Sequence, residues 1–300
     1  MVQRLSFEDE ISRNKLKSMV LIGVVMVFLI LLGFIVSWFF DPSYFFVIMI
    51  ISIVFSIGYT IYSYYNSDKI ALASVHAVPA NEREHRQLLH SVENMALAAG
   101  LPVPRTFVMH SEQINAFASG RDPQHAVICV TTGMLEKLNK HEMEGVIAHE
   151  MSHIANFDIR FMTLTAVIVG MISILAEIFL RSLWFSKGDN DRGKGGAILI
   201  ILGLVFAILA PIVAQLVALA ISRKREFGAD ATGVKFTRYP KGLADALTKI
   251  KHEHVSERDR HKYAKALAPL FISDPFKKKI KGLFSTHPDI DERIERLQRM

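Results

Sequence analysis

The residues of this sequence best suited to chemistry are His149, Glu150 and His153, in the pattern His-Glu-Met-Ser-His. On a helix, residues four apart lie on one face, so both imidazoles can approach a single ion. A catalytic zinc takes three protein ligands and keeps one position for water, and the glutamate can take a proton from that water. The pattern is the signature of metalloproteases. The alternative is a pair of polar histidines on a solvated helix face.

A zinc site of this kind needs a third protein ligand, and Glu226 is a better candidate than any remaining histidine. The other histidines lie in polar helical stretches or beside predicted strands and turns, without partner spacing. Asp230 follows Glu226 by four residues, so a helix would place both carboxylates on one face. One can bind the metal while the other accepts the N–H of a metal-bound histidine. Alternatively, the two carboxylates cap the helix or pair with the basic residues 223–225.

The composition indicates a membrane protein. The chain has 300 residues, of which 51% are hydrophobic, and a mean hydropathy of +0.28. Four apolar stretches are each longer than the ~20 residues that cross a bilayer core. The third of them contains Glu177 and Arg181, so it is either a span or a buried or re-entrant helix. The four stretches are residues 18–40, 44–65, 161–185 and 195–222.

The charges next to these stretches predict the orientation. Residues 1–17 are basic, whereas the link at residues 41–43 has no Lys or Arg, which places the N-terminus in the cytoplasm. The third and fourth stretches return the chain to its starting side, so Glu226 can meet the two histidines near the membrane surface. The net charge of +6 fits this positive-inside bias. The single cysteine, Cys129, excludes an intrachain disulfide.

The remaining segments predict a mainly α-helical domain with a small β-sheet, an α+β fold. The motif helix is expected to run from about residue 140 to residues 156–160, directly into the third apolar stretch. Residues 115–120 are either a half-apolar strand or a loop, and Thr132-Gly133 is a turn. Further helices are expected at residues 84–99, ended by Gly100, and 242–251, and strands at residues 106–109 and 126–131.

Three ordered motifs resemble the HtpX-type membrane zinc metalloproteases, which are gluzincins related to the CAAX prenyl proteases. The first is the His149 motif. The second is Ser222-Arg223-x-x-Glu226-Phe227-x-Ala229-Asp230, and the third is Ser285-Thr286-His287-Pro288 with Glu292-Arg293. The resemblance covers nearly the whole chain. Two departures from the family pattern are Phe227, where tyrosine is frequent, and Asp289, where a second proline is common.

The resemblance implies a zincin-like protease domain with about four transmembrane helices and one zinc ion per chain. It implies that His149, His153 and Glu226 bind zinc, that Glu150 is general base and then acid, and that Asp230 supports a ligand. His287 and Arg293 match positions thought to stabilise the oxyanion. The stretch Asn115, Ala116, Phe117 and Ala118 resembles the family's edge strand, to which an extended substrate adds as a β-strand.

These expectations divide the chain into four parts. Residues 1–66 are a cytoplasmic tail with two transmembrane helices, and residues 67–160 are the first part of the protease domain. Residues 161–222 are two further hydrophobic helices, and residues 223–300 are the second part, with the third zinc ligand.

The function expected from the resemblance is that of a zinc endopeptidase of the cell membrane. It would hydrolyse misfolded or surplus membrane proteins on the cytoplasmic side, in quality control and the stress response. Its partners would be protein substrates and the lipid bilayer, and nothing in the sequence points to nucleic acid. The basic run Lys277–Lys281 would bind anionic headgroups or form a solvated helix face. Alternatives are a non-catalytic metal-binding scaffold or holdase, disfavoured by Glu150, and a prenyl-protein (CAAX) protease, which needs about seven spans.

Overall fold

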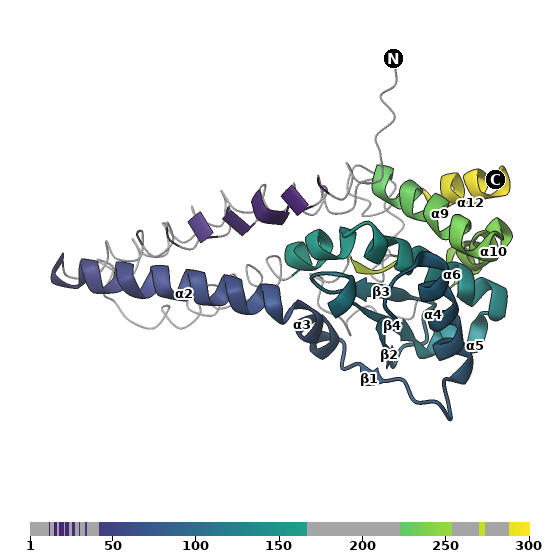
Figure 1. Cartoon of the computed structure of the whole chain (residues 1–300), viewed down its shortest axis with the longest axis horizontal. Coiled ribbons are helices and arrows are strands. Elements are labelled where there is room, and N and C mark those ends of the chain that lie inside the picture. The colour runs from purple at the N-terminus through teal and green to yellow at the C-terminus, as the bar shows by residue number, and fades with distance from the viewer. Residues whose placement is uncertain are drawn as a thin grey trace, which may run out of the picture.

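The computed structural model describes residues 42–166, 223–253, 270–273 and 288–300, together with isolated positions between Ser12 and Phe34. The fold is mostly helical with one small mixed sheet, as the sequence predicts (Figure 1). The elements before the sheet are η1 (Pro42–Tyr44), α2 (Phe45–Tyr65) and α3 (Ser67–Ser74). The strands are β1 (Val78–Pro79), β2 (Arg105–Met109), β3 (Ala116–Ser119) and β4 (Val127–Thr131), and η2 (Pro123–His125) precedes β4. The other helices are α4 (Arg86–Ala99), α5 (Thr132–Lys137), α6 (Lys140–Ala155), α9 (Arg223–Thr237), α10 (Pro240–His252) and α12 (Ile290–Gln298).

Most of the predicted elements of the protease domain are present. The two predicted strands and the helices at residues 84–99, 140–156 and 242–251 are confirmed within a few residues, and Gly100 ends α4 with a left-handed φ of 68°. The half-apolar stretch at residues 115–120 is a strand, β3. The turn expected at Thr132-Gly133 is wrong. The Thr131 side chain accepts a hydrogen bond from the Met134 amide, and this N-cap starts α5 at Thr132.

The sheet has the strand order β1-β2-β4-β3, so β3 is an edge strand of the four. β2 and β4 are parallel, while β3 pairs with β4 antiparallel, with Ala116 opposite Val130 and Ser119 opposite Val127. Every residue of β4 is buried, because helices cover both faces of the sheet.

Alternate residues of the strands feed two separate hydrophobic clusters. One face carries Ala116, Ile128 and Val130, which pack with α4, α6 and α10 in the larger cluster. The other face carries Phe117 and Cys129, which pack with α3 and with residues 158–166, a helix that follows α6. This period of two is the signature of a strand between two packed layers.

The motif helix α6 is the centre of the domain. A capping box starts it: the Asn139 side chain accepts from the Glu142 amide at 3.1 Å, and Glu142 Oε2 accepts from the Asn139 amide at 2.8 Å. From Met143 to Ile154, all residues but Glu144 are buried. α6 lies between the sheet side and the pair α9 and α10, so it has no solvated face from Gly145 to Ile154.

Two glycines allow this close packing. A Cβ built on Gly145 of α6 would lie 2.5 Å from the Leu243 amide nitrogen of α10, closer than real contacts allow. A Cβ built on Gly233 of α9 would lie 3.1 Å from the His149 amide nitrogen. The second approach brings the helix of Glu226 and Asp230 against the first histidine of the motif.

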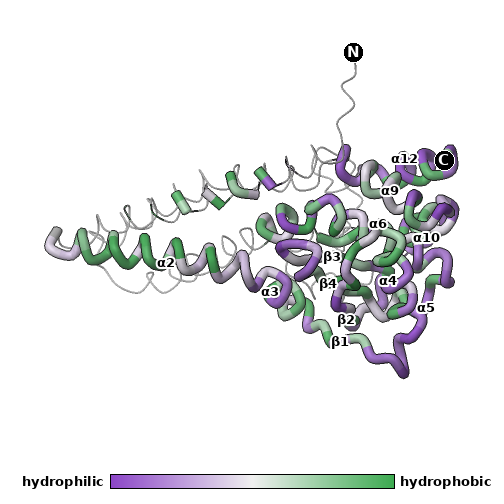
Figure 2. The backbone as a smooth tube through the Cα atoms, viewed as in Figure 1, coloured by the Kyte–Doolittle hydropathy of each residue, from purple (hydrophilic) through white to green (hydrophobic). Residues whose placement is uncertain are grey.

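α2 extends away from the protease domain as an apolar arm (Figures 1 and 2). Among the described residues it is the one helix long and apolar enough to cross a membrane. It confirms the predicted stretch 44–65 as a continuous helix. The stretches at residues 18–40 and 161–185 are described only in part, and the stretch at 195–222 lies outside the described residues.

The close approach at Gly145 leads to a stability prediction. Gly145→Ala should lower the free energy of unfolding by about 1–3 kcal/mol, because the new methyl group must push α10 away from α6. Gly228→Ala is the matched control, since its Cβ would meet nothing within 4 Å in α9 and a helical Gly→Ala change is worth up to about 1 kcal/mol of stabilisation. Thermal unfolding in detergent measures both variants, and equal melting temperatures would contradict the packing argument.

Candidate metal centre and active site

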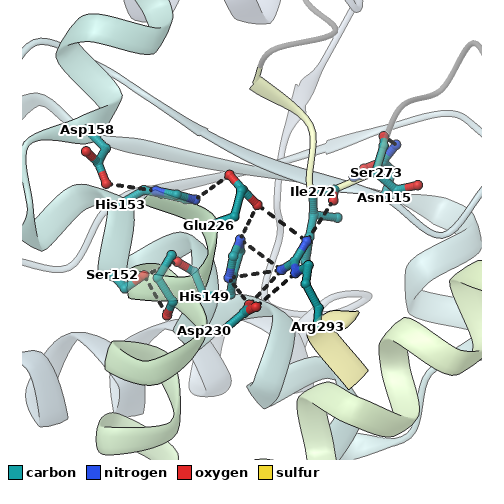
Figure 3. A network of polar contacts seen from close by, with 11 residues as sticks. Asn115, His149, Ser152, His153, Asp158, Glu226, Asp230, Ile272, Ser273 and Arg293 are labelled. Atoms are coloured by element: carbon teal, nitrogen blue, oxygen red, sulfur yellow. Dashed lines mark hydrogen bonds and ion pairs between the residues drawn. The ribbon is translucent and has the colours of Figure 1, made fainter. Parts of the chain in front are cut away.

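Two helices bring the three predicted metal ligands together. His149 and His153 lie one turn apart on α6, and Glu226 lies in the first turn of α9 (Figure 3). Ligand atoms of the three residues all lie within 4.8 Å of one another. The two histidines are 0% and 3% exposed, so the alternative of a solvated helix face is wrong.

The geometry of the three ligands fits a small metal ion. His149 Nε2 lies 3.6 Å from one carboxylate oxygen of Glu226, and His153 Nε2 lies 3.7 Å from the other. Ligand bonds of ~2.0–2.1 Å at tetrahedral angles require ligand atoms to be roughly 3.4 Å apart. Both Nε2 atoms therefore face a shared point beside Glu226.

Asp230 orients the first histidine, as its spacing predicts. Its Oδ1 lies 2.9 Å from His149 Nδ1, which leaves Nε2 to face Glu226. Arg293 of α12 donates from Nε and Nη2 to the two oxygens of Asp230, at 2.9 and 2.7 Å. Although burial opposes ionisation, Arg293 and His149 hold the pKa of Asp230 below its usual value. This bidentate pair fixes the carboxylate that fixes the imidazole.

The second histidine has its own orienting carboxylate, Asp158, which sequence reasoning missed. Asp158 Oδ2 lies 3.1 Å from His153 Nδ1, and its Oδ1 lies 2.8 Å from Nε of the buried Arg225. Asp158 follows His153 by five residues, which is not a contact spacing within one helix. Phe157 has a left-handed φ of 57° and ends α6, and this turn folds Asp158 back onto His153.

Glu150 is buried beside the ligands, with 1% exposure. Burial raises the pKa of Glu150, while the neighbouring histidines and the backbone N–H of Ala118 act in the opposite direction. Its Oε1 has no hydrogen-bond partner among the described residues. A buried carboxylate oxygen without a partner is costly, so the site is built to receive a donor there, such as a water molecule.

Among the described residues, the buried charges of the site are unbalanced without a cation. Four carboxylates, those of Glu150, Asp158, Glu226 and Asp230, are buried with two guanidinium groups, those of Arg225 and Arg293. With neutral imidazoles, two negative charges remain, which matches one divalent ion.

The same excess of negative charge acts on His149. Burial and the charge of Arg293 lower the pKa of His149, but its hydrogen bonds to Asp230 and Glu226 outweigh them and raise it to about 9. Without metal, a proton on His149 thus supplies part of the missing positive charge.

The other predicted site residues are placed as follows. Arg293 is buried in the site, with Nη1 3.4 Å from Glu226 Oε2. Asn115, Ala116, Phe117 and Ala118 are buried at the sheet edge next to α6, and the segment 270–273 covers that edge. His287 lies outside the described residues.

His149, His153 and Glu226 could hold one metal ion next to the buried Glu150, which is the arrangement of a metallopeptidase. Comparisons with known proteins agree. Residues 82–300 match the description Peptidase family M48. The chain is 44% identical over 291 residues to a protein named Protease HtpX homolog from Thermoanaerobacter pseudethanolicus, which covers 96% of this chain and 95% of that protein. A Streptococcus pyogenes protein of the same name is 38% identical over 299 residues, 97% of this chain and 99% of that protein.

A solved structure is also similar, the crystal structure of S. mikatae Ste24p, with 19% identity and a TM-score of 0.48. The match covers 95% of this chain and 65% of that chain. The chain belongs to peptidase family M48, within the HtpX-type membrane metalloproteases.

Asp158 is expected to set the metal affinity through His153. Asp158→Asn should weaken zinc binding about 10- to 100-fold, because the imidazole loses its charged acceptor and the ion pair between Asp158 and Arg225 is lost. Competition with a chromophoric chelator measures the affinity. Asp291→Asn, which removes an exposed carboxylate paired with Lys251, is the control and should bind zinc like the wild type. Equal affinities of the two variants would refute the role of Asp158.

Metal binding should depend on pH through His149. Below pH about 9 the metal-free site holds a proton on His149, which a metal ion must displace. The apparent affinity for zinc should therefore rise by about tenfold per pH unit toward that pH and then level off. Chelator competition in a pH series measures this slope, and an affinity that does not change with pH would contradict it.

Proposed function

We propose that this membrane metalloprotease is a zinc endopeptidase that hydrolyses misfolded or surplus membrane proteins on the cytoplasmic side, in quality control under stress. One observation carries the proposal of peptide hydrolysis: the buried cluster of His149, His153 and Glu226 lies beside a buried Glu150, one oxygen of which has no hydrogen-bond partner in the part of the chain that the structure describes. A pure metal-binding scaffold needs the three ligands but has no use for that costly fourth group.

The proposed metal is zinc, one ion per chain, held by His149, His153 and Glu226. Two imidazoles and one carboxylate are a usual ligand set for catalytic zinc. When bound there, zinc would polarise the scissile carbonyl and lower the pKa of water to about 7.

The protein groups then divide the remaining work. Glu150 takes the proton from the attacking water and delivers it to the nitrogen of the leaving amine. Asp230 and Asp158 hold the two imidazoles in the tautomer that turns Nε2 toward the metal. Arg293 is the proposed oxyanion donor through Nη1, because Nε and Nη2 are already bound to Asp230. His287 is the proposed second donor, on the family resemblance alone.

Contacts between the end of α2 and the protease domain support the proposal that the substrates lie in or near the membrane. Arg121 donates to the backbone oxygen of Tyr65, in the last turn of α2, at 3.2 Å, and its guanidinium lies 4.8 Å from the Tyr65 ring. Arg160 donates to the Arg121 oxygen at 2.7 Å and lies over the ring of Tyr64. A cation at the C-terminal end of a helix is electrostatically favourable.

The residues that contact α2 lie on segments next to the active site. Arg121 comes two residues after the end of β3, and Arg160 lies on the same helix as Asp158. The proposed span is therefore fastened to the two segments that position the substrate strand and His153. This holds the active site close to the membrane surface.

The proposed topology has four spans, with both termini and the active site in the cytoplasm. Residues 1–66 and 161–222 would supply two spans each, and residues 67–160 and 223–300 the two parts of the protease domain. α2 supports the second span.

The test is cleavage of two substrates in the same liposomes, an unfolded soluble protein and an unfolded protein with a membrane anchor. Glu150→Gln should keep its metal but lose roughly 10²- to 10⁴-fold in kcat/KM on both, because the general base is lost while the ligands remain. The wild type should cleave the anchored substrate faster.

Equal rates for wild type and Glu150→Gln would show that Glu150 is not the base. Metal without cleavage by the wild type would favour the scaffold, and cleavage confined to a C-terminal prenyl-cysteine motif would favour the prenyl-protein protease.

A further inference from the structure

The outer edge of β3, which does not face β4, pairs with the chain's own residues Leu270–Ser273. Phe117 and Phe271 form an antiparallel bridge, and the Ile272 amide donates to the Ala116 oxygen at 3.0 Å. In this register residue 272 is opposite 116 and residue 273 is opposite 115. The segment therefore lies along β3 as an added antiparallel strand, which is the arrangement expected for an extended peptide.

The hydrogen bonds from Asn115, Ala116 and Arg293 to this segment are made to its main chain. The Asn115 side chain donates from Nδ2 to the Ser273 oxygen at 2.8 Å and accepts from the Ser273 amide at 3.4 Å (Figure 3). Arg293 Nη1 donates to the Ile272 oxygen at 3.5 Å. Contacts of this kind do not depend on side-chain identity, so another extended chain could take the same place.

The segment also lies next to the catalytic groups. Arg293 Nη1, which contacts the Ile272 oxygen, is 3.4 Å from the metal ligand Glu226. The strand that the segment covers packs against α6, the helix that carries Glu150. A peptide that follows β3 must pass these groups, and Leu270–Ser273 now fill that path.

Leu270, Phe271 and Ile272 are all buried among apolar residues, and Phe271 lies beside Phe117. Phe271 is 1% exposed and meets the Phe117 ring edge to face, with 5.4 Å between the ring centroids. Met109, Cys129 and Met162 belong to the same cluster. The site of Phe271 is large enough for an aromatic residue and has no charged side chain among its cluster members.

We propose that Leu270–Ser273 is an internal stand-in for the substrate, which an incoming extended peptide displaces from β3. The site of Phe271 then becomes the subsite for a large apolar residue, with Phe117 as the residue that determines this specificity. The proposal rests on the proposed peptidase function and adds to it the mode of substrate binding. The proposal accounts for selectivity for unfolded chains, because only an extended apolar segment competes with the internal one. The apparent affinity for a peptide is then the intrinsic affinity multiplied by the fraction of molecules in which the internal segment has left β3.

A reversible cross-link tests the displacement. The pair Ala116→Cys and Ile272→Cys, in a Cys129→Ala background, places two thiols opposite each other in the observed register. Oxidation should abolish cleavage of an unfolded protein, by at least roughly 100-fold, and reduction should restore the rate that the same variant showed before oxidation. Restoration shows that the variant is folded. Full activity of the oxidised protein, with the disulfide verified by mass, would overturn the proposal.

A binding measurement separates this proposal from the peptidase function. The same cysteine pair is combined with Glu150→Gln, and a fluorescent extended peptide containing Phe is titrated into the oxidised and reduced forms. Binding only to the reduced form supports displacement even if no cleavage is ever seen, and equal binding to both forms overturns it. Single Ala116→Cys is the control for oxidation. If the first pair does not cross-link, Ala118→Cys with Leu270→Cys offers the next pair in the same register.

Peptide preference tests the subsite. Two peptides that differ only in Phe or Gly at one position are compared in wild type and in Phe117→Leu. The wild type should favour Phe by about tenfold or more in binding, and Phe117→Leu should reduce that ratio. Equal binding of both peptides to the wild type would refute the subsite.

Discussion

The structure depends on the crossing of α6 and α9, where the described residues bury more carboxylates than guanidinium groups. Gly233 lets α9 approach the backbone of α6 at His149, and this brings Glu226 and Asp230 against the motif helix. Removing one member of a buried charged pair typically costs about 3–5 kcal/mol. The site therefore stabilises the fold only while each carboxylate keeps its partner. Arg225 neutralises Asp158 and Arg293 neutralises Asp230. A divalent ion would neutralise the charges of the two glutamates that remain.

In this arrangement, two separate pairs of a carboxylate and a guanidinium group hold the two imidazoles. Asp230 and Arg293 hold His149 from the side of α12, whereas Asp158 and Arg225 hold His153 from the turn after α6. Each pair joins elements far apart in the chain, so the positions of the candidate metal ligands depend on tertiary structure and not on helix spacing alone. The capping box at Asn139 and the buried faces of α6 then keep the helix itself in register.

Sequence reasoning could find those parts of the site that follow a helical repeat. His149 and His153, and Glu226 and Asp230, are pairs four residues apart, and the structure places both pairs on helices that meet. Asp158 could not be found, because its contact depends on the left-handed turn at Phe157, a conformation that phenylalanine rarely adopts. β2 and β4 could be predicted from their β-branched composition, whereas the composition of β3 fits a strand or a loop and the sequence does not predict β1. The pairing of Phe271 with Phe117 did not, because nothing local to either residue specifies so distant a partner.

The internal strand and the charge network meet at Arg293. Two of its nitrogens are bound to Asp230, and the third faces both Glu226 and the Ile272 oxygen. When a peptide replaces the internal strand, a substrate carbonyl takes the place of that of Ile272, without any change in the groups that hold His149. The same guanidinium would thus support the metal ligand at all times and contact whichever main chain lies on β3. Catalytic readiness and the exclusion of folded proteins are then compatible, because the metal site is complete before the substrate strand is exchanged.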